Sequence, residues 1–367
     1  MIGPSQPLPR LFGMLPGKLC AHLQAQGVRA NEGEARRYLA HWISHGRTGV
    51  PSKPPSRKFL DGARALVDHR RLEVVERVTD PADGFTKYLF RSPDGALSEA
   101  VRIPLAKEGC FTVCLSSQVG CAMQCDFCAT GRLGLTRNLA PWEIVSAFCT
   151  VRDEAPGRVT GAVFMGQGEP FHNYDAVIQT ARILCDPCGG RVAKKAITIS
   201  TVGLVPQIRR FTMERHGYRL IVSLTSALPE RRRALLPVAG RFEMEDLAAA
   251  IREYSEVAKG LVTVAWVLLG GVNHDQAEVD AVRTLLGDVP LRVNLIDVND
   301  AREEDDGGYR RATEVERNLF FDALQALEVP IVRRYSGGGN ERAACGMLAA
   351  SHSATADPGA AAATRAE

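Results

Sequence analysis

Three cysteines lie close together in the chain, at Cys121, Cys125 and Cys128, separated by intervals of four and three residues. Thiolates at these intervals can bind three corners of a cubane iron–sulfur cluster from one short loop. Iron–sulfur clusters are normally held by four thiolates. A loop with three cysteines therefore predicts a fourth iron that binds a ligand from outside the protein.

An aromatic residue, Phe127, stands directly before the third cysteine. With this residue the run resembles the cysteine motif of the radical S-adenosylmethionine (radical SAM) enzymes. The resemblance implies a [4Fe–4S] cluster on Cys121, Cys125 and Cys128. It also implies that the open iron chelates the amino and carboxylate groups of SAM.

A zinc site is the main structural alternative for these thiols. Zinc is usually held by four ligands in paired Cys-x-x-Cys or Cys/His motifs, and here it would have to join Cys185 and Cys188 to the triplet. A disulfide framework is disfavoured, because ten cysteines in 367 residues is a modest density and the first residues form no apolar signal segment. We therefore expect a reduced, cytoplasmic protein, which suits an oxygen-sensitive cluster.

The charge of the chain is unevenly distributed. Residues 1–71 contain twelve Lys and Arg against four acids, which gives +8, so the remainder must sum to −5 because the whole chain carries +3. A small basic module on a mildly acidic body favours a polyanionic partner, RNA or DNA. A solvated helical surface that is basic by composition explains the same charge equally well. No apolar run reaches the length of a membrane span, so no membrane partner is expected.

The pattern of apolar residues divides the chain into three regions of different predicted secondary structure. Residues 10–70 are predicted to be helical, with a break at 51–55, and 72–105 to form strands at 72–78, 88–91 and 98–103. Beyond the cysteine loop, strands alternate with helices. The predicted strands are 159–165, 196–200, 218–224, 261–269, 291–296 and 329–334, and the predicted helices are 174–184, 204–211, 244–258, 276–286 and 312–327.

Strand–helix alternation of this kind predicts an α/β fold with a parallel sheet, here a partial (β/α)6 barrel. Functional residues in such barrels lie at the C-terminal ends of the strands. Small polar residues stand at these ends and could orient a nucleoside and an amino-acid group, although each could also cap the following helix. The candidates are Gly168, Glu169, Ser200, Ser223, Leu224, Thr225 and Asn299.

Several segments together narrow the resemblance beyond the superfamily. They are Cys114-Leu-Ser-Ser-Gln-Val-Gly-Cys121, Arg137-Asn138-Leu139, Met165-Gly-Gln-Gly-Glu-Pro170, Ser200-Thr-Val-Gly203 and Ala343-Ala-Cys345-Gly346. Over residues 10–348 the chain resembles the RlmN/Cfr family of radical SAM enzymes, which methylate an adenine ring carbon of RNA. The resemblance implies SAM contacts at the seven strand-end residues and an RNA-contacting role for the basic N-terminal module.

The resemblance also implies a two-stage reaction, since an adenine ring carbon is a poor nucleophile. Cys345 would accept a methyl group from one SAM, and a 5′-deoxyadenosyl radical from a second SAM would activate that S-methyl group. The carbon would join C2 or C8 of adenine, Glu99 would accept a proton, and Cys114 would resolve the adduct through a transient disulfide with Cys345. An ordinary strand-surface glutamate is the alternative for Glu99, and core packing is the alternative for Cys345.

Some residues depart from the family pattern. Thr225 stands where the family usually has His, Gln167 where an apolar residue is commoner, and the loop 337–341 differs before Cys345. Two basic runs, 209–210 and 231–233, are candidates for further RNA contacts or for ordinary helix surface.

The sequence as a whole predicts four regions. They are a basic helical RNA-binding module at 1–71, a β-rich extension at 72–106, a radical SAM core at 107–348 and a disordered tail at 349–367. The resemblance implies methylation of C2 or C8 of adenine in 23S rRNA, and of tRNA as a second target, by a monomer that receives electrons from an external donor such as flavodoxin. The alternatives are a radical SAM enzyme that modifies a protein partner and a non-enzymatic zinc protein that binds RNA.

Overall fold

The computed structural model describes residues 7–46, 54–300, 302 and 304–334. Cys345, the loop 337–341 and the predicted tail 349–367 lie outside the described residues. None of the helices in the described ranges is long and apolar enough to cross a bilayer.

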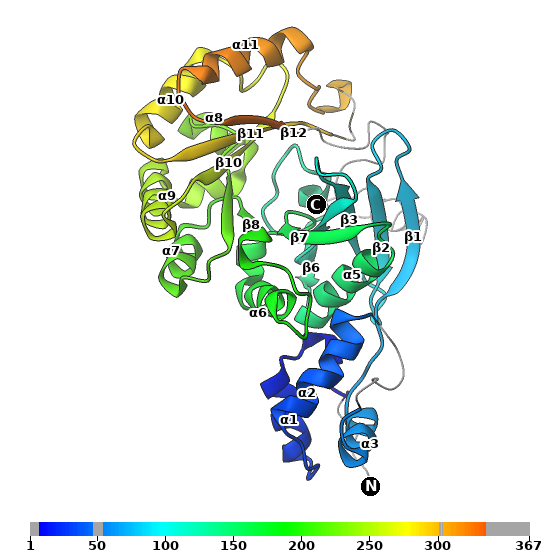
Figure 1. Cartoon of the computed structure of the whole chain (residues 1–367). Coiled ribbons are helices and arrows are strands. Elements are labelled where there is room, and N and C mark those ends of the chain that lie inside the picture. The colour runs from blue at the N-terminus through cyan, green and yellow to red at the C-terminus, as the bar shows by residue number, and fades with distance from the viewer. Residues whose placement is uncertain (1–6, 47–53, 301, 303, 335–367) are drawn as a thin grey trace, which may run out of the picture.

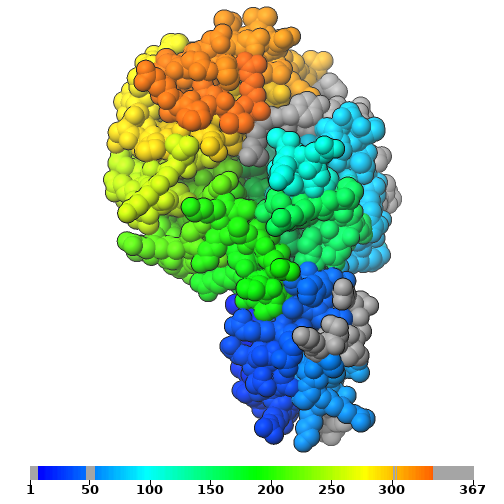
Figure 2. Space-filling view, in the orientation of Figure 1, coloured from blue at the N-terminus to red at the C-terminus, as the bar shows by residue number. Residues whose placement is uncertain are grey.

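The N-terminal part of the chain is helical, as predicted. Asn31 accepts a hydrogen bond from the Glu34 backbone N–H at 3.0 Å, and Ser56 accepts one from that of Phe59 at 3.4 Å, so each caps the helix that follows it. These helices form a narrow extension from one end of a broader body (Figure 2). The elements are η1 (Leu11–Gly13), α1 (Pro16–Ala25), α2 (Glu32–Leu39), the π-helical η2 (Ala40–Ser44) and α3 (Arg57–Leu66).

Polar and cationic contacts attach this helical extension to the body. Gln179 donates a hydrogen bond to the Gly13 carbonyl at 2.7 Å, and the Arg10 guanidinium lies 4.4 Å from the centre of the Trp142 ring. Arg71 forms an ion pair with Asp153 at 2.8 Å.

One ten-stranded sheet forms the body (Figure 1), with strand order β1-β2-β3-β4-β7-β8-β9-β10-β11-β12. The first four strands pair antiparallel: β1 (Glu73–Thr79), β2 (Thr86–Arg91), β3 (Leu97–Pro104) and β4 (Cys110–Leu115). Three of them match the predicted strands, whereas β4 was not predicted.

From β4 onward every neighbouring pair is parallel. The strands are β7 (Arg158–Phe164), β8 (Ile197–Thr201), β9 (Arg219–Ser223), β10 (Val262–Leu268), β11 (Leu291–Asp297) and β12 (Ile331–Arg334). The helices are α5 (Pro141–Asp153), α6 (Tyr174–Cys185), α7 (Val205–Glu214), α8 (Pro229–Leu235), α9 (Met244–Ala258), α10 (Gln276–Leu286) and α11 (Glu314–Gln325).

The strands β4 and β7–β11 are each followed by helix, and β12 ends the sheet. This arrangement confirms the predicted (β/α)6 architecture. Because β1 and β12 are the two ends of the sheet order, the barrel is open. The alternating faces of the strands and the apolar faces of the helices share one large core that includes Val113, Phe148, Phe164 and Trp266.

Candidate active site

The three cysteines lie in a loop held at its base by a short hairpin. Its strands, β5 (Gln118–Gly120) and β6 (Leu135–Asn138), flank the cysteines and the short helix α4 (Ala129–Arg132). Gly120 has φ of +73°, and a Cβ there would lie 1.8 Å from the Gly134 carbonyl oxygen. Any residue larger than glycine would therefore force the two strands apart.

Burial dominates the electrostatics of the thiols. It raises the pKa of Cys121 to about 12 and that of Cys125 well above its ordinary value. The Cys128 N–H donates to the Cys125 carbonyl at 3.1 Å, so these two cysteines share one turn of the loop. Metal ligation requires thiolates, so a bound metal must displace these protons.

As the structure describes them, the three cysteines do not form a site for a single metal ion. Within the described ranges, no three His, Cys, Asp or Glu side chains form a group that could hold one metal ion. A cubane cluster needs another geometry, because each thiolate binds its own iron. The same finding gives no support to a zinc site that joins the triplet to Cys185 and Cys188, whose thiols lie at and beyond the end of α6.

The loop after β7 places Gly168 and Glu169 beside the cysteine hairpin. Gly168 has φ of +94°, and a Cβ there would lie 2.5 Å from the Cβ of Gln118. Gln118 accepts a hydrogen bond from the Glu169 backbone N–H at 2.9 Å. The Glu169 carboxylate accepts bonds from the N–H groups of Phe171 and Val202, both at 2.9 Å. Burial nevertheless raises the pKa of Glu169 to about 7.

Polar residues also stand at the ends of the next strands. Ser200 in β8 and Ser223 at the end of β9 have their hydroxyl oxygens 3.5 Å apart. Asn299 follows β11 and accepts a hydrogen bond from Arg311 at 3.2 Å. The predicted strand-end residues are thus at the C-terminal ends of β7, β8, β9 and β11, where parallel barrels carry their active sites.

Thr225 is held in a conformation that β-branched residues rarely adopt. Its φ is +60°, and the Ser226 N–H donates to the Leu224 carbonyl at 2.6 Å, so the chain makes a tight three-residue turn. The Thr225 side chain is fully buried, and its hydroxyl has no hydrogen-bond partner among the described residues. An unpartnered buried hydroxyl at a strand end fits a site that a polar ligand completes.

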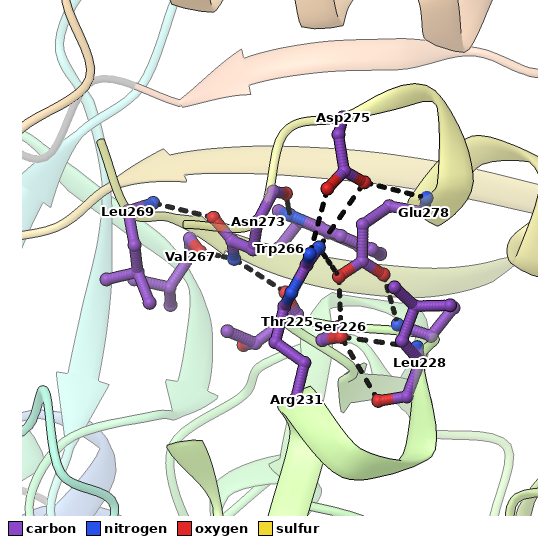
Figure 3. Close-up of polar contacts among 11 residues, drawn as sticks. Thr225, Ser226, Leu228, Arg231, Trp266, Val267, Leu269, Asn273, Asp275 and Glu278 are labelled. Carbon is purple, nitrogen blue, oxygen red and sulfur yellow. Dashed lines mark hydrogen bonds and ion pairs between the residues drawn. The ribbon is translucent and has the colours of Figure 1, made fainter. Parts of the chain in front are cut away.

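A network behind Thr225 holds this turn (Figure 3). Asn273 donates to the carbonyls of Thr225 at 2.6 Å and Val267 at 2.8 Å, and accepts from the Leu269 N–H at 2.9 Å. Glu278 is fully buried and accepts bonds from Ser226 and the Ala227 N–H at 2.6 and 2.7 Å. The strained backbone conformation of the Thr225 turn is therefore stabilised by hydrogen bonds to Asn273 on one side and to Glu278 on the other.

Cys114 and Glu99 share one face of adjacent strands. Cys114 in β4 is paired with Val101 in β3, and Glu99 lies two residues from Val101. Residues two apart point to the same face of a sheet, and such diagonal neighbours lie roughly 7–8 Å apart. Val113 and Leu115 belong to the large apolar core, so Cys114 and Glu99 lie on the opposite face.

Both residues are almost fully buried, with Glu99 4% exposed and Cys114 6% exposed. The interpretation of Glu99 as a strand-surface residue is therefore wrong. The second predicted reactive thiol, Cys345, lies outside the described residues.

One residue of the basic run 231–233 is not ordinary helix surface. Arg231 binds Asp275 and Glu278, and Arg233 lies 3.4 Å from Glu243, but Arg232 is only 2% exposed. An RNA or solvent contact is thus wrong for Arg232. The sequence could have predicted this burial. Arg232 stands three and four residues before the buried Leu235 and Leu236, a spacing that places all three on one face of a helix.

Comparisons with known proteins agree with this geometry. The Radical SAM superfamily model matches residues 115–281. A probable RNA methyltransferase of Anaeromyxobacter sp. (strain Fw109-5) is 49% identical and covers 86% of this chain and 92% of its own length. The dual-specificity RNA methyltransferase RlmN of Syntrophobacter fumaroxidans is 37% identical, covering 89% of this chain and 94% of its own.

A solved structure extends the agreement to three dimensions. The crystal structure of a radical SAM methyltransferase from Sphaerobacter thermophilus matches with a TM-score of 0.83 at 33% identity, covering 92% of this chain and 98% of that one. The superfamily implies SAM and an iron–sulfur cluster. The chain is therefore a SAM-dependent enzyme that belongs to the RlmN/Cfr family of radical SAM RNA methyltransferases.

Proposed function

We propose that this enzyme transfers a methyl group from SAM to C2 or C8 of adenine in RNA, with 23S rRNA as the main target and tRNA as a second. The single observation that carries the proposal is the shared sheet face of Cys114 and Glu99, next to the cysteine loop and the strand-end residues. A thiol and an acid on one face are the pair that the disulfide and proton-transfer steps of this reaction need. The names of the relatives support RNA as the substrate.

The residues for both cofactors fit this role. Cys121, Cys125 and Cys128 would hold a [4Fe–4S] cluster, and the seven residues at the strand ends would bind SAM. Bound there, the cluster supplies the electron that cleaves SAM reductively. Among the described residues, the Thr225 hydroxyl without a partner and the buried Glu169 carboxylate would offer hydrogen bonds to SAM.

The chain's own reactive groups would then share the remaining steps. Cys345 accepts the methyl group that is later transferred, so its sulfur holds the carbon while it joins the base. Glu99 takes the proton from the ring carbon once the adduct has lost its unpaired electron, which the cluster would take back. Cys114 attacks the Cys345 sulfur, so that a disulfide forms and the sulfur–carbon bond breaks, and the released methylene carbon takes a proton to become the methyl group of the adenine. The protein works as a monomer with an external one-electron donor such as flavodoxin.

A labelling experiment tests this proposal. The reconstituted protein is incubated with RNA, reductant and SAM whose methyl group is fully deuterated, and the digested nucleosides are analysed by mass spectrometry. We expect 2-methyladenosine or 8-methyladenosine that has lost one deuteron, because a hydrogen atom leaves the methyl group before transfer. A fully deuterated methyl group would contradict the radical route. Label found on a protein and not on RNA would favour the protein-modifying alternative, and Cys128→Ala serves as the inactive control.

A further inference from the structure

One arginine beside the active site is buried without an acidic partner. Arg232 in α8 is 2% exposed, and among the described residues no carboxylate pairs with it. Its guanidinium donates instead to the backbone carbonyls of Val202 at 2.6 Å, of Ser223 at 3.0 Å and of Leu224. Carbonyls satisfy its N–H groups but leave its positive charge uncompensated.

These contacts place the charge between the SAM-binding strand ends. Ser223 ends β9 and Leu224 follows it, while Val202 follows β8 and donates its own N–H to Glu169. The space is tight, since a Cβ on Gly203 would lie 3.3 Å from the Arg232 guanidinium.

The helix that carries Arg232 also packs on the cysteine loop. The Asp126 N–H, one residue after Cys125, donates to the carbonyl of Leu235 at 3.1 Å, one helical turn beyond Arg232. The positive charge of Arg232 acts on Cys125 and opposes the burial that raises the pKa of this thiol. Burial lowers the pKa of Arg232 to about 10, so the side chain remains charged at neutral pH.

A buried charge is costly unless an opposite charge lies nearby. Two kinds of group near Arg232 can become negative: the Glu169 carboxylate, which is bonded to the same residue, Val202, and the thiols of the cysteine loop, against which α8 packs. An iron–sulfur cluster held by three thiolates carries a net negative charge, and this charge grows by one when the cluster is reduced. A fixed cation therefore stabilises the reduced cluster more than the oxidised one.

We infer that Arg232 is the counter-charge of the iron–sulfur cluster and raises the potential at which the cluster accepts its electron. The inference rests on the proposed function, because it requires a cluster on the three cysteines. Arg232 is a positioning residue, since it acts through the cluster and touches no reacting atom.

An anaerobic redox titration of the cluster, without SAM, tests the inference. It compares wild type, Arg232→Gln, Arg232→Lys and Arg233→Gln, after iron and sulfide analysis of each protein. Arg233→Gln is the matched control, because it removes the same charge one residue away, from an exposed side chain paired with Glu243. We expect Arg232→Gln to lower the equilibrium constant for reduction about tenfold, which for a one-electron couple is about 59 mV.

The variants separate charge from hydrogen bonding. We expect Arg232→Lys to restore most of the wild-type potential and Arg233→Gln to leave it unchanged. An unchanged potential in Arg232→Gln, or an equal shift in Arg233→Gln, overturns the inference. If Arg232→Gln does not retain the cluster, Arg232→Lys decides: a potential near wild type supports the inference, and a tenfold or greater loss overturns it. Wild-type protein that binds no cluster overturns both this inference and the proposed function.

Discussion

The side-chain oxygen of Gln167 accepts a hydrogen bond from the backbone N–H of Glu99 at 3.2 Å. Ser116 adds a second link, because its hydroxyl donates to the Glu99 carbonyl at 2.6 Å and accepts from the Gln167 N–H at 3.0 Å. The loop that carries Gly168 and Glu169 is thus fixed to the strand that carries Glu99. Gln167, a departure from the family pattern, has a defined structural role.

Replacing Gln167 by Met tests this link. The change keeps the volume but leaves the buried Glu99 N–H without its acceptor, which costs roughly 1–3 kcal/mol. We expect a lower free energy of unfolding and slower RNA methylation. Gln325→Met is the control, because Gln325 is exposed on α11 and should change stability by no more than about 0.5 kcal/mol. Equal stability of the two variants would show that the bond contributes nothing.

Glu169 predicts a pH dependence of stability in the protein without cofactors. Its pKa rises from an ordinary 4.5 to about 7 because the carboxyl group is buried. The folded state therefore binds this proton more tightly than the unfolded chain does, and stability falls as the pH rises through this window. We expect the stability of wild type relative to Glu169→Gln to drop by on the order of 3 kcal/mol across it. Chemical unfolding at several pH values measures this difference, and parallel curves for the two proteins would contradict it.

Asn273 is predicted to affect SAM binding without touching SAM. Asn273→Ala removes three side-chain hydrogen bonds and leaves the strained Thr225 turn without its clamp. We expect a loss of at least about 2 kcal/mol in stability and weaker SAM binding by equilibrium titration. Thr225→Gly relieves the strain at φ +60°, so we expect the double variant to lose less affinity than the sum of the two single variants. Strict additivity would show that Asn273 does not support this turn.

Cys114 is predicted to be needed for product release. Cys114→Ala removes the thiol that attacks Cys345, so we expect a covalent protein–RNA adduct to accumulate, visible as a shifted band on denaturing gels. Cys20→Ala is the matched control, because Cys20 is buried to a similar extent, at 7% exposed, in the N-terminal helices. An adduct in both variants, or in neither, would contradict the assigned role.

The periodicity of the sequence predicted the fold because each core strand is a short apolar run flanked by an amphipathic helix. The strand β4 (Cys110–Leu115) was missed, since it includes two cysteines in a short apolar run and no helix separates it from β3. The burial of a side chain by elements that are distant in the sequence could not be predicted. Arg232 looked like one of three surface arginines, and its burial depends on loops that lie eight to thirty residues earlier in the chain.

In the candidate site, too, some features were predictable from the sequence and others were not. Spacing alone predicted the cysteine loop, and the strand ends predicted the positions of Ser200 and Ser223. The strained turn at Thr225 and its support by Asn273 were beyond the sequence, because they depend on contacts between residues 48 positions apart. Non-local hydrogen bonds of this kind have no periodic signature.

The most direct test of the account is peptide mass spectrometry of the reconstituted protein after treatment with SAM. The account predicts a one-carbon adduct on Cys345, and loss of RNA methylation when Cys345 is replaced by Ala. An unmodified Cys345 in a protein that still cleaves SAM reductively would contradict the two-stage mechanism, while leaving the iron–sulfur site intact.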